Sequence, residues 1–166
     1  MVDRDAPRLN PATEDEIHGY FDRLADALIG ADFEAYADSI CLPFVITTRA
    51  DRFVVAEREG LRSSFSTWQR TINVRRATSL HHRVTRIDPH GATGVLVEYV
   101  TDLLAGSQRA LPAFTNWIYL RRDASGFRAE QLMTALTNRQ GDLFLMVDPG
   151  HLTLDATGEP DREASG

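Results

Sequence analysis

The chain has 166 residues, 43% of them hydrophobic and 25% charged, which is enough for one globular domain with its own core. Its formal net charge of −6 argues against a nucleic-acid partner, because surfaces that bind nucleic acid are usually basic. No apolar run approaches the roughly 20 residues that cross a bilayer, and the single cysteine, Cys41, cannot form an internal disulfide. We therefore expect a cytoplasmic protein that neither binds nucleic acid nor enters a membrane.

The basic residues exclude two classes of chemistry, because all 18 of them are arginines. Without lysine the chain can form neither a Schiff base nor a phosphate-binding loop of the Walker type. The glycines at 91–94 lie between two predicted strands, not at the start of a helix, so they are not a dinucleotide-binding fingerprint. We expect no cofactor.

The N-terminal half is predicted to be mostly helical. After a flexible leader at 1–12, Thr13 and Glu16 form a T-x-x-E capping box, which predicts the start of a first helix. Apolar residues follow at spacings of four, three and four, and Gly30 ends the helix. The residues of this apolar stripe are Ile17, Phe21, Leu24 and Leu28.

A second helix, a hairpin and a third helix follow. Asp32 is the expected N-cap of a short helix that ends before Pro43. The β-branched runs at 44–48 and 52–57 predict a hairpin. A third helix is expected from about Arg58, because the helical spacing of apolar residues returns there.

Beyond the third helix the apolar period changes to two and predicts four strands, at 78–88, 94–104, 112–122 and 127–137. Helices followed by consecutive antiparallel strands indicate an α+β fold with helices on one face of a sheet. We expect one domain over 13–154, followed by a polar tail at 155–166.

Three stretches together resemble the nuclear transport factor 2-like superfamily. "YFDRLADALIGADFEAYADSI" resembles its first two helices with their Gly-Asp corner, and "AEREGLRSSF" resembles the entry into its third helix. "WIYLRRDASGFRAEQLMTAL" resembles its closing hairpin. The likeness covers about 14–137. It implies a cystatin-like cone, in which three N-terminal helices pack on a strongly curved antiparallel sheet around a pocket.

The resemblance also implies a homodimer that forms through the outer face of the sheet. In "AFTNWIYLR" both faces of the predicted strand are largely apolar, whereas helices can cover only one. Activity is not implied, because the superfamily includes ketosteroid isomerases, dehydratases, SnoaL-like polyketide cyclases and binding modules that share one cone.

Adjacent histidines at 81 and 82 invite the hypothesis of a metal site. Neighbouring side chains on a strand point to opposite faces, so His81 and His82 cannot bind one ion together, and we expect no metal. If Leu80, His82 and Val84 point inward, His82 lies on the pocket wall, where it is either a hydrogen-bonded wall residue or an acid–base group.

Two acids on the second long strand are candidate catalytic residues. Glu98 and Asp102 share one face of the strand and, if that face is inward, either could work as a base with His82, with Asn116 as an oxyanion donor. The alternative is that both acids lie on an exposed face, which the cost of burying charge favours.

The remaining candidates are apolar or aromatic residues that could contact a ring-shaped ligand near the mouth of the cone. They are Tyr20, Tyr36, Phe44, Trp68, Ile118 and Met133. Three functions stay open: a binding protein for a small, largely apolar molecule; a lyase or isomerase; and a dimerisation module with a filled cone.

Overall fold

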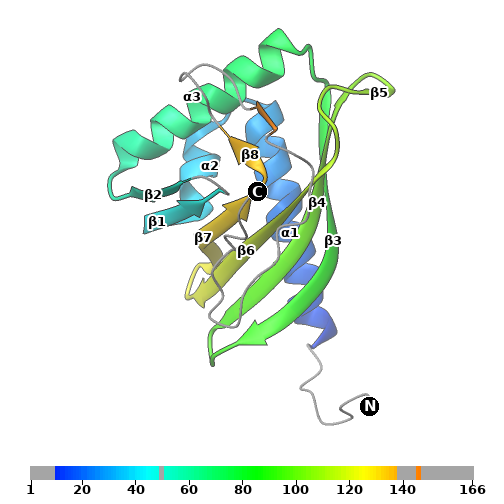
Figure 1. The fold of residues 1–166 in the computed structure, drawn as a ribbon. Coiled ribbons are helices and arrows are strands. Elements are labelled where there is room, and N and C mark those ends of the chain that lie inside the picture. Colours follow the sequence, from blue (N-terminus) through cyan, green and yellow to red (C-terminus); the bar gives the residue numbers. More distant parts are fainter. Residues whose placement is uncertain (1–9, 49–50, 138–144, 147–166) are drawn as a thin grey trace, which may run out of the picture.

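The computed structural model describes residues 10–48, 51–137 and 145–146. Three helices and nine strands are found in these ranges (Figure 1). The helices are α1 (Pro11–Ile29), α2 (Phe33–Asp38) and α3 (Arg58–Val74). The strands are β1 (Ile40–Thr47), β2 (Arg52–Val55), β3 (Ser79–His90), β4 (Gly94–Ala105), β5 (Gln108–Arg109), β6 (Phe114–Asp123), β7 (Gly126–Thr134), β8 (Leu136–Thr137) and β9 (Leu145–Met146). The predicted helices, hairpin and four long strands are all present.

The main sheet is mixed, which corrects the expectation of a purely antiparallel one. Its strand order is β2-β1-β7-β6-β4-β3, with β5 added beside β4, and every neighbouring pair is antiparallel except β1 and β7. The last long strand returns beside the first one in the same direction. Hydrophobic patterns identify strands but carry no information on which distant strands pair, so the sequence could not show this parallel contact.

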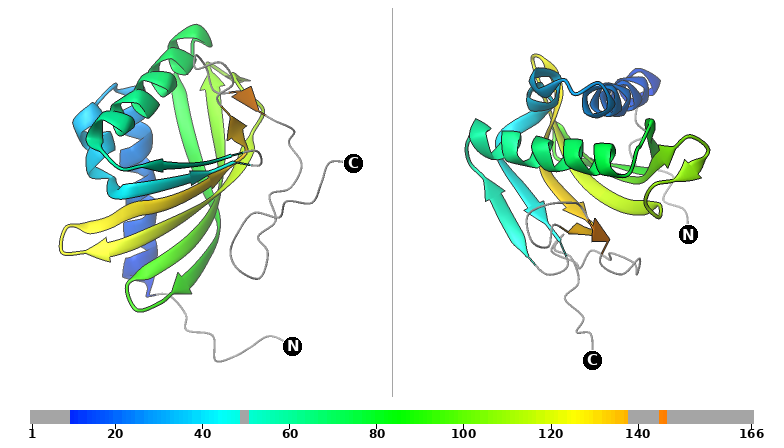
Figure 2. Two further views of the ribbon diagram at one scale, coloured as in Figure 1. Left: turned by 60° about the vertical axis from the view of Figure 1, so that its left-hand side comes forward. Right: turned by 90° about the horizontal axis from the view of Figure 1, so that it is seen from above.

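Irregular pairing accompanies the bend of the sheet. Thr85 is an extra residue in β3, because Val84 pairs with Tyr99 while Arg86 pairs with Glu98. Such bulges increase the local twist and bend a strand. A second irregularity lies in β1, where Pro43 has no backbone N–H to donate to the neighbouring strand. The sheet curves around the helices without closing into a barrel (Figure 2).

The helices lie on the concave face of the sheet, and the core fills the space between the two layers (Figure 2). Helix α1 packs along β3, while α2 and α3 cover the end of the sheet formed by β1 and β2. The largest fully buried side chains come from both layers, among them Phe21 of α1, Leu61 of α3 and Leu103 of β4. Within the described ranges, no helix is long and apolar enough to cross a membrane.

The start of α1 differs from the capping box that the sequence predicts. The helix begins at Pro11, and the side chain of Asn10 accepts a hydrogen bond from the backbone N–H of Ala12 at 3.0 Å. Thr13 and Glu16 instead contact Arg122 of β6, which donates to the Thr13 hydroxyl and forms an ion pair with the Glu16 carboxylate. Proline favours the first helical position, so Asn-Pro is the true start signal.

This assignment can be tested by removing the observed cap residue and the one that the sequence predicts, in separate variants. Asn10→Ala is expected to lower the free energy of unfolding by about 1 kcal/mol, because it leaves a helix N–H without its acceptor. Thr13→Ala is the matched control and should change it by less than about 0.5 kcal/mol, because its contact is exposed. Urea denaturation measures the free energy of unfolding of both variants. A larger loss for Thr13→Ala than for Asn10→Ala would contradict the assignment.

Candidate functional site

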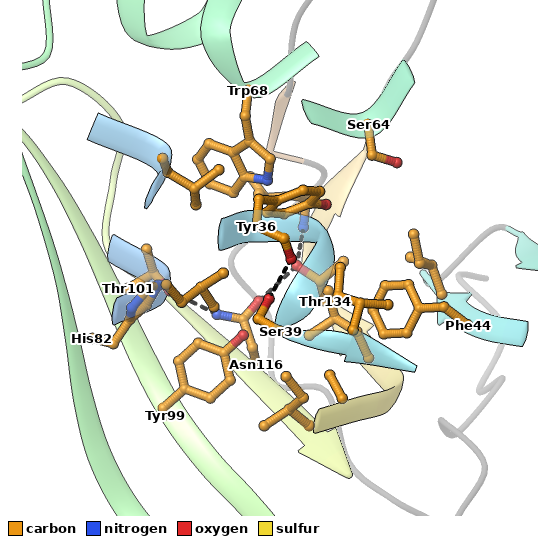
Figure 3. A pocket seen from close by; sticks show the side chains of 18 of the residues that line it. Tyr36, Ser39, Phe44, Ser64, Trp68, His82, Tyr99, Thr101, Asn116 and Thr134 are labelled. Carbon is orange, nitrogen blue, oxygen red and sulfur yellow. Dashed lines mark hydrogen bonds between the residues drawn. The ribbon is translucent and has the colours of Figure 1, made fainter. Parts of the chain in front are cut away.

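A cavity of about 110 Å³ lies between the three helices and the concave face of the sheet (Figure 3). Residues from all three helices and from six strands line it, and most of their side chains are apolar. The lining consists of Tyr20, Leu24, Leu28, Tyr36, Ser39, Ile40, Phe44, Ile46, Ser64, Trp68, His82, Tyr99, Thr101, Phe114, Asn116, Ile118, Ala129, Leu132, Thr134 and Leu136.

The strand registers place the polar lining in one row. Asn116 of β6 pairs with Tyr99 of β4 on one side and with Thr134 of β7 on the other, and all three face the cavity. Thr101 lies two residues from Tyr99 and therefore on the same face of β4. One stripe of hydrogen-bonding groups thus crosses an otherwise apolar wall (Figure 3).

The Asn116 amide is held by both threonines. The backbone N–H of Leu136 donates to the Thr134 hydroxyl at 3.1 Å, which leaves the hydroxyl proton free to donate to Oδ1 of Asn116 at 2.6 Å. Nδ2 of Asn116 then donates to the Thr101 hydroxyl at 3.0 Å. This chain determines which end of the amide is oxygen, and it satisfies a side chain that is only 2% exposed.

The three tyrosines of the cavity differ in how their hydroxyls are used. Tyr20 donates to the backbone carbonyl of Ser39 at 2.9 Å. The hydroxyls of Tyr36 and Tyr99 have no hydrogen-bond partner in the part of the chain that the structure describes, although both residues are buried. Burial raises the pKa of each of these phenols above its usual value, so all three stay protonated and able to donate.

His82 is the one histidine among the lining residues, and it is neutral. Its Nδ1 lies 3.3 Å from the backbone carbonyl oxygen of Phe21, and its ring packs at 5.5 Å from the Phe21 ring and 5.3 Å from the Tyr99 ring. Burial lowers the pKa of His82 to about 4, although the Phe21 carbonyl and the Asp22 carboxylate both favour the charged form. Since a carbonyl only accepts, the proton of the neutral ring is on Nδ1, and Nε2 carries a lone pair.

The structure brings most of the sequence-predicted residues together at this cavity. Of the ten candidates, seven line it: Tyr20, Tyr36, Phe44, Trp68, His82, Asn116 and Ile118. Leu80 and Val84 share the inner side of β3 with His82, as the inward alternative required, whereas exposed His81 points to the other side.

The two candidate acids lie on the outer face of the sheet instead. Glu98 accepts a hydrogen bond from the Thr85 hydroxyl at 2.6 Å, and Asp102 forms an ion pair with Arg109 at 3.0 Å. The alternation of β4 explains this, because the fully buried residues Val97 and Leu103 occupy the odd positions. No carboxylate is among the lining residues in the described ranges, so neither acid can work with His82.

Met133 also lies away from the cavity. It pairs with Trp117 of β6, whereas its neighbours Leu132 and Thr134 line the cavity, so Met133 occupies the outer face. Across the described ranges, no group of three or more His, Cys, Asp or Glu side chains is arranged to hold a metal ion.

The sequence interpretation missed five polar lining residues, which are Ser39, Ser64, Tyr99, Thr101 and Thr134. A signal for two of them was present: the even positions of β4 include Glu98 and Asp102, so the odd positions had to be the buried set. Thr134 had no such signal, because a register shift in β7 after Ala129 changes which residues face inward.

The neutral state of the half-buried His82 makes the free energy of unfolding depend on pH. The unfolded histidine titrates near its ordinary pKa of 6.5 and the folded one at about 4, so the unfolded chain binds more protons between these values. The contribution of neutral His82 to the free energy of unfolding is fully present above about pH 6.5. As the pH falls to about 4 the protein loses this contribution, which is on the order of 3 kcal/mol. Urea denaturation across this range measures it.

Matched variants identify the group responsible. His82→Gln should flatten the pH dependence over this window, whereas His90→Gln should leave it unchanged because His90 is exposed. A wild-type stability that does not fall between pH 6.5 and pH 4 would show that His82 is charged in the folded protein.

Comparison with known proteins gives similarity in structure only. No protein-family model and no curated protein matches the chain. Solved structures do match. A domain of unknown function with a cystatin-like fold from Nostoc punctiforme is 16% identical with a TM-score of 0.58, over 76% of this chain and 78% of that one.

Two further neighbours agree with this result. A nuclear transport factor 2-like protein of unknown function from Shewanella oneidensis has a TM-score of 0.58 at 10% identity, over 73% of this chain and 97% of its own. Aln2 from a Streptomyces species has a TM-score of 0.60 at 13% identity, over 78% of this chain and 93% of its own. The narrower resemblance to SnoaL-like cyclases stays a prediction. The chain has the cone-shaped, cystatin-like fold of nuclear transport factor 2-like proteins.

Proposed function

We propose that the chain binds one small, largely apolar molecule inside the cone. The observation that carries this proposal is a cavity whose apolar lining includes the phenols of Tyr36 and Tyr99. Their hydroxyls have no hydrogen-bond partner in the described ranges and are open to the hollow rather than sealed in the core. Buried polar groups are normally paired, and unpaired ones are costly unless water or a ligand reaches them. An apolar hollow with a few polar groups is also the usual form of a ligand site.

The enclosed space of the cavity has room for about one ring. An engineered cavity of about 150 Å³ lined by apolar side chains holds benzene. The cone cavity, at about 110 Å³, is of similar volume. A four-ring steroid is far too large for this space, which argues against the steroid-type reaction found elsewhere on this fold.

An acid–base lyase or isomerase is the second candidate function. His82 favours it, because its Nδ1 is held by the Phe21 carbonyl and its Nε2 is free of a partner in the described ranges. However, a general base works best with a pKa near the working pH, and burial lowers the pKa of His82 to about 4. With Glu98 and Asp102 outside, no lining carboxylate can raise it, so binding is the better-supported function.

Filling the cavity tests the proposal. Ala129 of β7 is 1% exposed and lines the cavity, so Ala129→Leu should occupy the space a ligand would take. We expect wild-type protein to bind toluene and the variant to bind it at least about tenfold more weakly. The free energy of unfolding should fall by less than about 1 kcal/mol, whereas overpacking a filled core costs about 1–3 kcal/mol.

Titration of toluene followed by the NMR shifts of cavity methyl groups measures both affinities. Ala35→Leu makes the same change at an exposed position of α2 and should bind toluene like the wild type. Absence of toluene binding to the wild type, or strong destabilisation by Ala129→Leu, would contradict a ligand-sized cavity.

We further propose that the chain forms a homodimer through the outer face of the sheet. Leu96 and Val100 of β4 lie half-buried on that face, where Leu96 is opposite Tyr119 of β6 and Val100 is opposite Thr115. Glu98 and the buried Trp117 pair between them. Helices cover only the concave face, so this apolar strip has no helical layer.

A cytoplasmic location is proposed on the lone cysteine alone.

A charge in the centre of the strip should separate the protomers. Val100→Glu is expected to convert a dimer into a monomer in sedimentation equilibrium, because an unpaired carboxylate would be buried at the interface. Ser107→Glu, in the exposed turn after β4, should remain dimeric. A monomeric wild-type protein at micromolar concentration would contradict the proposal.

A further inference from the structure

The uncommitted polar atoms of the cavity define what a ligand must offer. Tyr20 is already bonded to the Ser39 carbonyl, and the Asn116 amide is bonded to Thr101 and Thr134. Among the described residues, the polar groups that remain without a partner include the hydroxyls of Tyr36 and Tyr99 and Nε2 of His82.

These atoms are not equivalent. A tyrosine hydroxyl can donate or accept, so it can satisfy almost any polar group on a ligand. Nε2 of a neutral histidine whose proton is on Nδ1 can only accept. The Phe21 carbonyl enforces that tautomer, so His82 requires a hydrogen-bond donor from the ligand.

The orientation of His82 is held by its surroundings. Helix α1 contributes the Phe21 carbonyl and ring. The Tyr99 ring of β4 packs edge-to-face against the imidazole, with an angle of 85° between the two ring planes. The charged or titratable groups that act on it are Asp22 of α1 and the neighbouring His81. The acceptor is therefore in place before a ligand arrives.

The cavity also lacks a partner for a charged ligand. None of its lining residues is an aspartate, glutamate or arginine, and His82 and the tyrosines are neutral. Moving an unpaired charge from water into such a space is strongly unfavourable. A ligand with an ionised group would leave that charge without a counterion.

We propose that the ligand of the cone is an uncharged single-ring compound with a hydroxyl group, which donates its hydrogen bond to Nε2 of His82. This inference rests on the proposed binding function and adds the chemical class of the ligand. The same hydroxyl oxygen can accept from a tyrosine, so one group satisfies both kinds of site. A ketone or ether of equal size can pair with the tyrosines but leaves Nε2 without a donor.

Phenol, anisole and toluene are suitable matched probes, because they share a ring and differ in the polar group. We expect wild-type protein to bind phenol roughly tenfold or more tightly than toluene or anisole, the ratio that one buried hydrogen bond gives. In His82→Phe, which keeps a ring but removes the acceptor, this preference should disappear while toluene still binds. His90→Phe makes the same change at an exposed histidine outside the cavity and should keep the preference for phenol.

A direct readout needs no variant. The ¹⁵N spectrum of the wild-type imidazole should show Nε2 unprotonated, and its shift should change when phenol is added but not when toluene is added. A phenol preference that survives His82→Phe, or an Nε2 shift insensitive to phenol, would overturn the inference. If toluene binds without any phenol preference, only the ligand class is wrong; if no probe binds, the binding function itself fails.

An ionisable probe tests the requirement for a neutral ligand. Nitrophenol binding should weaken as the probe itself loses its proton between about pH 5 and 9, a range over which the lining side chains keep their charge state. Equal affinity for the phenol and its anion would overturn that part of the proposal.

Discussion

The uninterrupted pairing of β4 with β6 is the constraint on which the cavity depends. From Gly94 opposite Arg121 to Thr101 opposite Phe114, every residue of one strand has a partner in the other. Because side chains alternate, this register places Tyr99 and Asn116 together on the concave face and leaves Glu98 beside Trp117 on the outer face. A slip by one residue in β4 would exchange its two faces and put Glu98 and Asp102 into the cavity.

The register also determines the chemistry of the wall. Three neighbouring strands each contribute one polar side chain at the same level, and the Asn116 amide bonds to Thr101 and Thr134. This network bonds the amide without using Tyr99 or His82, both of which line the cavity. The polar groups in the centre of this wall are already hydrogen-bonded, whereas Tyr99 and His82 can still bond to a ligand. Such a wall is more selective than a purely apolar one, because a ligand must match these two groups.

Helix α1 contributes to the same site from the other layer. Phe21 supplies the ring that packs on His82 and the carbonyl that accepts the hydrogen bond from its Nδ1. Tyr20, the preceding residue, donates its hydroxyl proton to the Ser39 carbonyl. A carbonyl inside a helix normally accepts only from the N–H four residues later, so the contact with His82 uses its second lone pair. The helix thus acts as a layer of the core and as the element that sets the protonation of the site.

The local pattern of the sequence determined the elements. Apolar residues at helical spacing, the Asp32 cap and the change to a period of two predicted helices and strands at nearly their observed positions, because these signals depend on neighbours along the chain. The same local information placed most of the lining residues, since Ile118 and Asn116 share a face on any strand. For Glu98 and Asp102 the pattern of β4 alone already favoured the outer face.

Strand pairing and the partners of buried side chains were decided only by the tertiary structure, because local periodicity carries no information on contacts between distant segments. The parallel contact of β1 with β7, the extra residue Thr85 and the register shift that turns Met133 outward all depend on pairing between segments far apart in the chain. The proton position on His82 depends on a carbonyl of α1, 61 residues away. Sequence neighbours specify which face a side chain shares, but the charge state and partners of a buried group are set by whatever the fold packs against it.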